Sequence, residues 1–345
     1  MRFSRHDHAA TARYQEVKRL AASQRRILAG TPGTLKKRSR GNTDYWVREY
    51  IRVDGRKDDE YLGTVGMTEE ARRRELSADI ELAKALASGS SILRALGYQR
   101  VERKTAGVLA ALFNRGLFRA GLTLVGSHAY GVLLNETGTF APAYRTQDID
   151  LARGQPLAIA LPAVLDLEHL LRESGLEFRA IPGMPSHAPS ASFKLRGAEA
   201  LAVDLLVPGP RTGAVVEVGE LGAHAQTIPL LDFLVAEPMG AVVLSPNQVV
   251  PVRVPSPERF VLHKMYASQN RRSTRDKVGK DLEQAAVLAA AVEEETPGRL
   301  ADAWRAFPAK GRPLVVRAIR PVASLLGEGH AEARMALEAL GRRSK

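Results

Sequence analysis

The stretch that decides the fold runs from residue 122 to 152 and reads "LTLVGSHAYGVLLNETGTFAPAYRTQDIDLA". An apolar run ends in the pair Gly126-Ser127, and twenty residues further on Asp148 and Asp150 flank a single isoleucine inside a second apolar run. Residues i and i+2 of a β-strand project to the same side, so the two carboxylates lie next to each other. Neighbouring like charges repel unless a cation lies between them. The pair therefore indicates either a site for a hard metal ion or an acidic strand edge that faces solvent.

A third carboxylate favours the metal site. Asp204 interrupts the apolar run "ALAVDLLVPG". If that strand lies beside the first, three carboxylates converge on one site, which is enough for two Mg²⁺ ions. The Gly126-Ser127 turn, at the start of a predicted helix, offers backbone N–H groups and a hydroxyl to a phosphate oxygen. Together these features indicate a nucleotide-transfer site.

The bulk properties narrow the class of protein. A chain of 345 residues is long enough for about two domains and a sizeable core. Cysteine is absent, which excludes disulfides and thiolate metal sites. No apolar run approaches the roughly 20 residues that span a bilayer, so no membrane partner is expected. Heavy use of Ala, Arg and Gly favours a bacterial, cytoplasmic protein.

The charge is strongly basic, with a formal net value of +12. Residues 1–66 contain 15 Lys and Arg against 8 Asp and Glu. This balance indicates either a polyanionic partner or a solvated basic surface. The densest run lies in "LKKRSRG", close to Tyr45, Trp46 and Tyr50. Basic and aromatic side chains together are typical of a nucleic-acid surface, although a hairpin docking on the rest of the protein also explains the aromatics. The candidate nucleic-acid contacts are Lys36, Lys37, Arg38 and Arg40.

Three regions follow each other along the chain, and together they predict an α+β protein. Residues 1–120 read as helical, with a β-hairpin near 43–63 that turns at Asp54-Gly55, and the first helix is expected to end at Gly30. Residues 121–255 switch to short strands separated by Pro and Gly, and form the predicted catalytic core, a small mixed sheet with flanking helices. Residues 256–345 read as a helical C-terminal domain.

The order of these motifs resembles the nucleotidyltransferase superfamily typified by DNA polymerase β. The resemblance is closest to a little-characterised bacterial branch, distantly related to abortive-infection and toxin nucleotidyltransferases. It covers roughly residues 120–290. Gly126-Ser127 is followed by Ala129-Tyr130, and the other matching motifs are "TQDIDLA", "VDLLVP" and "PERFVLHKM". The hairpin "YWVREYIRVDGRKDDEYLG" is also similar to that branch. The spacing between Ser127 and Asp148 is about twice that of most superfamily members.

The resemblance implies a role for each residue of the motifs. Asp148 and Asp150 hold two Mg²⁺ ions, or Mn²⁺ in their place, and Asp204 completes the site and helps to deprotonate an acceptor hydroxyl. That hydroxyl attacks the α-phosphate of a nucleoside triphosphate and expels pyrophosphate. Gly126 and Ser127 hold the terminal phosphates.

A cationic helix face is the expected partner of the phosphates. In "SPERFVLHKMYASQNRRSTRDKVGKDLEQA", Lys264, Arg271 and Arg275 share one face of a continuous helix, with Lys264 innermost; a solvated helix face is the alternative. His263 reads as a packed histidine, and His128 is ambiguous. Two further cations on a strand before Asp204 face either the cleft or solvent. They are Lys194 and Arg196.

Two classes of function remain open. The first is a Mg²⁺-dependent nucleotidyltransferase that acts on an NTP and on RNA such as tRNA, a protein or a small molecule, in a toxin or defence role. The second is a non-catalytic nucleic-acid-binding or regulatory protein that keeps the fold. Retention of all three aspartates with Gly126-Ser127 favours the enzyme. The acceptor, the nucleotide, any antitoxin partner and the oligomeric state do not follow from the sequence.

Overall fold

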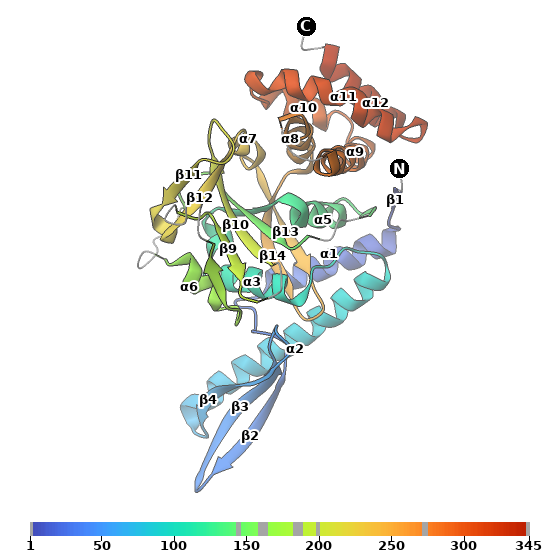
Figure 1. The fold of residues 1–345 in the computed structure, drawn as a ribbon. Helices are drawn as coiled ribbons and strands as arrows, with labels where there is room; N and C mark the ends of the chain where they lie inside the picture. The colour runs from blue at the N-terminus through green and yellow to red at the C-terminus, as the bar shows by residue number, and fades with distance from the viewer. Residues whose placement is uncertain are drawn as a thin grey trace.

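The computed structural model describes residues 3–142, 146–157, 165–181, 189–197, 201–270 and 275–342. The protein is a mixed α+β structure with three parts in a row (Figure 1). A small β-sheet forms an arm at one end, a larger sheet lies in the middle, and helices from the C-terminal part of the chain gather at the other end. Within the described ranges, no helix has the length and apolar character needed to cross a membrane.

The N-terminal helix α1 (His8–Ala22) packs on the body by one apolar face. Tyr14 and Val17 are buried, and the Asp7 carboxylate caps the helix by accepting a hydrogen bond from the Ala10 amide at 2.7 Å. The expected end at Gly30 is wrong. The Ser23 hydroxyl donates to the Leu20 carbonyl at 2.7 Å, so the last turn is closed by a side chain directly after Ala22.

The arm is a three-stranded antiparallel sheet. Its strands are β2 (Thr34–Arg40), β3 (Thr43–Ile51) and β4 (Lys57–Thr64), in that order across the sheet. Strands β3 and β4 form the hairpin with its turn at Asp54-Gly55, where Gly55 has φ 89°. Strand β2 is an addition that the sequence pattern did not indicate, because its Lys and Arg residues hide any alternation of apolar and polar positions.

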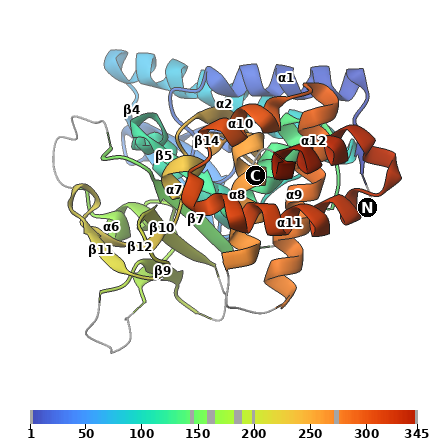
Figure 2. The same ribbon diagram turned by 90° about the horizontal axis from the view of Figure 1, so that it is seen from above.

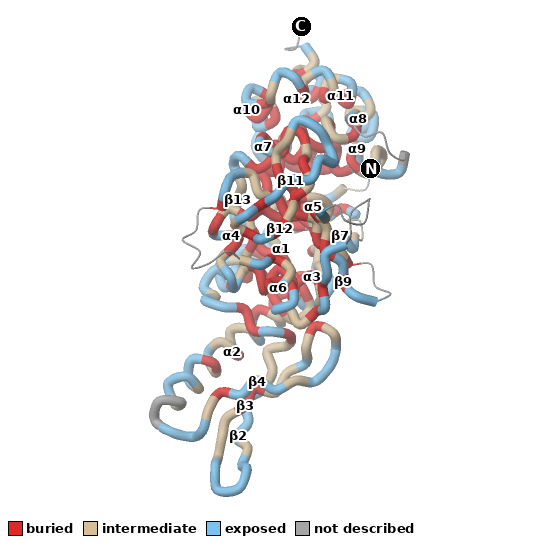
Figure 3. The backbone as a smooth tube through the Cα atoms, turned by 60° about the vertical axis from the view of Figure 1, so that its left-hand side comes forward, coloured by how far each residue is buried: buried red, intermediate tan, exposed pale blue. Residues whose placement is uncertain are grey.

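One long helix joins the arm to the body. Helix α2 (Met67–Ala95) contributes Leu76 and Ile80 to a cluster with Leu62 of β4, so its outer half covers one face of the arm. Its inner half contributes Leu86 to a second cluster with α1. Most of the arm's remaining surface is exposed or half-buried (Figure 3).

The central sheet has seven strands of mixed direction. Strand β7 lies between β5, to which it is antiparallel, and β10, to which it is parallel. On its other side β10 pairs with β9 through its first residues and with β12 through its last. Strand β8 extends β9, and β11 extends β12. The strands are β5 (Leu122–Val125), β7 (Asp148–Arg153), β8 (Phe178–Ala180), β9 (Ser192–Leu195), β10 (Ala202–Pro208), β11 (Val215–Val218) and β12 (Ala223–Ile228).

Helices and one further hairpin surround this sheet. Strands β13 and β14 pair antiparallel, and β14 lies against α3 and β5. The helix α5 runs from the end of β5 across β13 towards α9 (Figure 1). The elements are α3 (Arg103–Asn114), α4 (Leu117–Ala120), α5 (Gly126–Glu136), α6 (Leu167–Arg172), α7 (Leu231–Leu234), β13 (Pro238–Leu244) and β14 (Val249–Pro255), with the short pair β1 (Ser4–Arg5) and β6 (Thr139–Phe140) and the 3₁₀ turn η1 (Gly219–Leu221).

The C-terminal helices cover the side of the molecule that lies opposite β9 and β11 (Figure 2). Helices α8 and α9 pack on each other, and α11 packs on both. The elements are α8 (Pro257–Asn270), α9 (Arg275–Glu295), α10 (Arg299–Ala306), α11 (Arg312–Leu326) and α12 (Ala331–Arg342), with 3₁₀ turns η2 (Ala309–Gly311) and η3 (Glu328–His330).

Candidate active site

Strand register brings the three aspartates to one face of the sheet. Asp204 of β10 lies directly opposite Asp150 of β7, and Ala202 lies opposite Asp148. Residues paired in register on adjacent strands point to the same side. The alternate residues Ile149 and Val203 are fully buried on the other side. Asp148, Asp150 and Asp204 therefore share one surface, called here the carboxylate face.

Asp204 is half-buried, and its surroundings change its pKa. Burial raises the pKa of Asp204 above its usual range, a hydrogen bond from Ser192 opposes that rise, and the negative charge of Asp148 adds to it. The Ser192 hydroxyl donates to Oδ1 of Asp204 from the neighbouring strand β9. Ser192 is a site residue that the sequence did not reveal, because only the pairing of β9 with β10 places it there.

The start of α5 is built around Asp150. Gly126 has φ +67°, a conformation that L side chains rarely adopt, and a Cβ at this position would lie 1.8 Å from Oδ2 of Asp150. The residue must therefore be glycine for two separate reasons. The N-cap residue Val125 offers no side-chain acceptor to the first-turn N–H groups of the helix. The Gly126-Ser127 turn thus combines a helix N-terminus with the carboxylate face.

The expected metal shell is not preformed. Within the described ranges, no group of three or more His, Asp or Glu side chains is arranged to hold a metal ion. The physical reason is visible in two of the aspartates: Asp204 is hydrogen bonded to Ser192, and Asp150 packs against Gly126, so the carboxylates turn to different partners. Their oxygens are nonetheless the ligands that Mg²⁺ and Mn²⁺ prefer, and Asp148 is exposed.

Lys194 lies on the same face as the aspartates. It pairs in register with Ala202, which in turn pairs with Asp148, and it is two residues from Ser192 on β9. Of the two orientations that the sequence left open, the register places Lys194 on the carboxylate face, at an exposed position. Arg196 lies beyond the end of β9.

Lys264, the expected innermost phosphate ligand, is engaged elsewhere. Its ammonium lies 2.7 Å from Oδ1 of Asp281 in a buried ion pair between α8 and α9. It also lies 5.3 Å from the centre of the Phe260 ring, which stacks on Tyr130 of α5. Arg271 is outside the described residues, and Arg275 begins α9 with a side chain that is likewise not described. The predicted cationic stripe therefore stays a prediction.

The two histidines differ in their surroundings. His128, in the first turn of α5, is buried, and this burial together with the positive charge of Lys280 lowers its pKa to about 4. Lys280 belongs to α9, which contacts α5. His263 is buried on α8, with Nε2 at 3.4 Å from the Pro229 carbonyl, as expected for a packed histidine.

The basic run of the arm is largely neutralised within the arm. Lys36 pairs with Glu49 at 2.5 Å and Lys37 with Asp44 at 2.6 Å. Arg38 pairs with Glu49 and, at 2.7 Å, with Asp59. Arg40 has no ion pair with any residue that the structure describes. Strand β2 is also the unpaired edge of its sheet, where Lys commonly prevents contact with a second strand.

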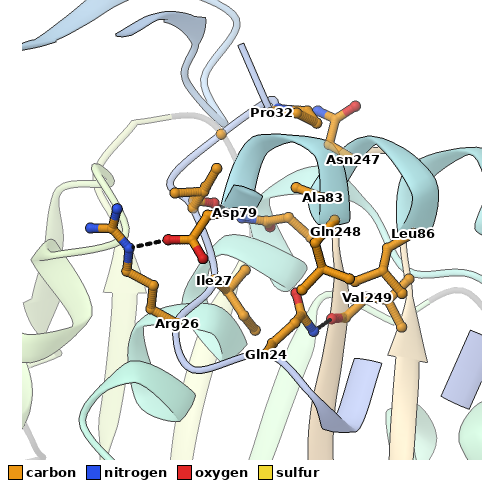
Figure 4. Close-up of a pocket in the computed structure, with 13 residues that line it drawn as sticks. Gln24, Arg26, Ile27, Pro32, Asp79, Ala83, Leu86, Asn247, Gln248 and Val249 are labelled. Atoms are coloured by element: carbon orange, nitrogen blue, oxygen red, sulfur yellow. Dashed lines mark hydrogen bonds and ion pairs between the residues drawn. The ribbon is translucent and has the colours of Figure 1, made fainter. Parts of the chain in front are cut away.

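A hollow between the arm's base and the body lies apart from these residues (Figure 4). It is lined by the segment 24–32 that follows α1, by α2 and by the β13–β14 turn. Arg26 Nε lies 2.9 Å from Asp79, and Gln24 donates to the Val249 carbonyl at 2.9 Å. Because the side chains of Arg26 and Gln24 already have hydrogen-bond partners within the protein, they give no indication of a bound ligand in this hollow.

Comparison with known proteins gives one match. A family model described as "Nucleotidyltransferase" matches residues 103–308, which is more than half of the chain. The matched region contains the carboxylate face and the start of α5, and it excludes the arm and α2. No curated protein and no solved structure matches.

Proposed function

The chain belongs to the nucleotidyltransferase family, and we propose that it transfers a nucleoside monophosphate from an NTP to an acceptor hydroxyl in a reaction that depends on Mg²⁺ or Mn²⁺. The observation that carries the proposal is the register that sets Asp204 beside Asp150, with Asp150 packed against Gly126. This arrangement joins three carboxylates to an uncapped helix N-terminus, and a nucleotide with its metal ions needs both.

The three aspartates would hold the metal. Asp148, Asp150 and Asp204 supply hard oxygen ligands, and closing of the carboxylates around the ions would offset the repulsion that contributes to the raised pKa of Asp204. Bound divalent ions would neutralise charge on the phosphates and orient them. Two ions are proposed, as in the superfamily that the sequence resembles.

The chain's own groups position the substrate and move the proton. The start of α5, with Gly126 and Ser127, would hold the terminal phosphates through N–H groups and a hydroxyl. The acceptor oxygen bonds to the α-phosphorus while the bond to pyrophosphate breaks, and the acceptor proton passes towards Asp204. A carboxylate whose pKa is raised is the better base of the three for this step.

One cation of the C-terminal helices can bind phosphate only if an existing ion pair opens. Lys264, Arg271 and Arg275 stay proposed phosphate ligands, but Lys264 could reach a phosphate only by leaving Asp281. Separating a buried ion pair is costly unless a new anion replaces the first. Binding of a triphosphate at Lys264 therefore requires the α8–α9 interface to rearrange.

The nature of the acceptor belongs to the proposal as well. RNA such as tRNA is favoured by the net charge of +12, and a toxin or defence role by the resemblance to abortive-infection proteins. The pairing of Lys36, Lys37 and Arg38 within the arm weakens the arm's share in nucleic-acid binding. A non-catalytic binding protein is the alternative, and it leaves the convergence of the aspartates unexplained.

The test is direct. The purified protein is incubated with each labelled NTP, with Mg²⁺ or Mn²⁺, and with total RNA or a protein extract. We expect label in one acceptor class, lost with chelator and lost in Asp148→Asn. Retention of transfer in Asp148→Asn would contradict the assignment, and absence of transfer with all acceptors would favour the binding protein.

A further inference from the structure

A second hollow opens along α5, beside the start of the helix. Its cavity volume is about 50 Å³, several times the roughly 10–15 Å³ that one water molecule requires. The first turns of α5, the segment 99–101 and the end of β13 line it, and no acidic residue is among the lining residues. Segment 99–101 precedes the region that the family model matches, so the hollow joins the family domain to the chain before it.

Three polar groups in this hollow have no hydrogen-bond partner among the described residues. His128 is more than nine-tenths buried, and its Nε2 is unpartnered. The buried Nε of Arg100 is unpartnered too, and Arg100 makes no ion pair with a residue that the structure describes. The Ser127 hydroxyl is the third group. A buried polar group without a partner costs on the order of 1–3 kcal/mol, so such groups usually mark a place where a ligand or water binds.

The other polar lining residues satisfy each other. Asn135 accepts from the Gln99 amide at 2.8 Å and donates to the Gln99 carbonyl at 2.9 Å. The Gln99 side chain donates to the Ala141 carbonyl at 3.1 Å. These bonds fix the backbone of segment 99–101 against α5, so the main chain of Arg100 has a fixed position, although its Nε has no partner among the described residues.

The electrostatic environment of the hollow is positive. Burial and the charge of Arg94 both disfavour the charged form of Arg100 and lower its pKa, and Lys280 acts on His128 in the same direction. The uncapped first turn of α5 adds the positive end of a helix dipole. A bound anion would balance the positive charges of Arg100 and Lys280 and of the helix N-terminus.

We propose that this hollow binds a phosphate group of the substrate, with Arg100, His128 and the Ser127 hydroxyl as hydrogen-bond donors. Guanidinium groups bind phosphate through charge-assisted hydrogen bonds, and a neutral imidazole donates through Nε2 when the proton resides there. The inference deepens the proposed function, on which it rests for the identity of the substrate. Two carriers share this chemistry: the phosphate tail of the NTP and a phosphate of the acceptor.

Binding of inorganic pyrophosphate without metal tests the site apart from the carboxylates. Isothermal titration in the presence of chelator is carried out on the wild type, on Arg100→Gln and on His128→Phe, which keeps a ring in the hollow. Arg119→Gln is the matched control, because it removes one exposed arginine that does not line the hollow. We expect about tenfold or greater weakening in Arg100→Gln, severalfold weakening in His128→Phe and no change in the control. Equal affinity in Arg100→Gln and Arg119→Gln would overturn the proposal.

Thermal melts exclude a merely structural role. Arg100→Gln removes a half-buried cation without a partner, so its melting temperature without ligand should equal or exceed that of the wild type, and only the shift caused by pyrophosphate should shrink. A large drop in melting temperature without ligand would mean that Arg100 supports the fold, and the proposal would be wrong.

Two comparisons show whether the NTP or the acceptor carries the bound phosphate, and whether the phosphate site exists independently of nucleotide transfer. In the transfer assay, Arg100→Gln raises KM for the NTP if the phosphate tail binds here, or KM for the acceptor if an acceptor phosphate does; no change in either KM overturns the proposal. Asp148→Asn should lose transfer but keep metal-free pyrophosphate binding. If no transfer is found with any NTP while Arg100→Gln still loses pyrophosphate, the proposed function fails and the phosphate site stands.

Discussion

The carboxylate face and the arm are both rich in charged residues, but opposite charges are paired in the arm, whereas like charges are gathered on the carboxylate face. On β2, Lys36, Lys37 and Arg38 each meet an acidic side chain of the same sheet. On the central sheet, Asp148 and Asp204 have no cationic partner among the described residues, and the charge of the first raises the pKa of the second. Charge that is compensated inside an element stabilises or protects that element. Like charge that is gathered without compensation is costly to the fold, which indicates that a ligand supplies the opposite charge.

The largest effect should come from removing one charge of the carboxylate face. Asp148→Asn should lower nucleotide transfer by at least about a hundredfold, because a metal ligand is lost. The same change should raise the melting temperature slightly in the absence of metal, since one of two repelling charges is gone.

Thermal melts with and without Mg²⁺ check this contrast. The wild type should gain stability with Mg²⁺, by about 2.7 kcal/mol when the ion is at a hundred times its dissociation constant, and the variant should gain less. Equal destabilisation of the variant in both conditions would give Asp148 a structural role.

Substitution of Gly126 should have the next largest effect, and Gly41 provides a matched control. Both glycines have positive φ, +67° and +60°, but a Cβ at Gly41 meets nothing within 4 Å, whereas one at Gly126 meets Asp150. Each Gly→Ala change should cost about 1–2 kcal/mol of unfolding free energy for the backbone conformation. Gly126→Ala should cost about 1–3 kcal/mol more through overpacking, and should lose transfer as Asp150 is displaced.

Denaturant unfolding of the two variants measures the difference. If Gly41→Ala and Gly126→Ala lose equal stability and both keep full activity, the contact between Gly126 and Asp150 does not shape the site.

A smaller effect is expected from Ser192, through the pH dependence of transfer. The hydrogen bond from Ser192 stabilises the charged form of Asp204, so Ser192→Ala should raise the pKa of Asp204 further. Because the ionised carboxylate is the active form, the acidic limb of the profile of kcat/KM against pH should move to higher pH. Ser192→Thr keeps a hydroxyl and should leave the limb near its original position. If the acidic limb of the profile does not move in Ser192→Ala, the ionisation that controls the rate is not that of Asp204.

The raised pKa of Asp204 also determines how the stability of the metal-free protein depends on pH. The folded state binds the Asp204 proton more tightly than the unfolded state, so this group reduces metal-free stability as pH rises from the ordinary Asp pKa through the raised one. Asp204→Asn should therefore stabilise the metal-free protein above that window.

The smallest effect should come from neutralising the arm. Reversing Lys36, Lys37, Arg38 and Arg40 to Glu would set like charges beside Asp44, Glu49 and Asp59, the present ion-pair partners, so Gln is the cleaner replacement. With three of the four cations already paired, the fourfold Gln variant should flatten the dependence of RNA retention on salt by about one phosphate contact or less, contributed by Arg40. A loss of three or four contacts would mean that the ion pairs open for RNA, and the contrast between the two regions would fail.

The strands of the carboxylate face can be predicted from the sequence, whereas strand β2 of the arm cannot. Alternation of Asp with Ile149 and Leu151 indicates a strand with a carboxylate face, because burial of one side of a sheet fixes the period of two. Strand β2 has no such period, since it lies at the edge of a sheet and none of its residues is buried. Its ion pairs depend on register with β3, which the sequence does not display.

Within the site, the sequence indicates the residues that interrupt an apolar pattern and misses those that the pattern hides. Asp204 and Gly126 stand out in this way. Ser192 and Arg100 do not, because the strands and helices beside them in the fold lie elsewhere in the sequence, and His128 is ambiguous in the sequence. The pairing of Lys264 with Asp281 is hidden for the same reason: both residues lie on helices whose packing is decided by tertiary contacts.

The central claim is that the carboxylate face transfers a nucleoside monophosphate, and two positions of the label on one NTP test it. With Mg²⁺ and the acceptor, label on the α-phosphate should enter the acceptor, and label on the γ-phosphate should be released as pyrophosphate. Both outcomes should disappear in Asp148→Asn. Transfer of the γ-label, or α-label transfer that persists in Asp148→Asn, would contradict the claim.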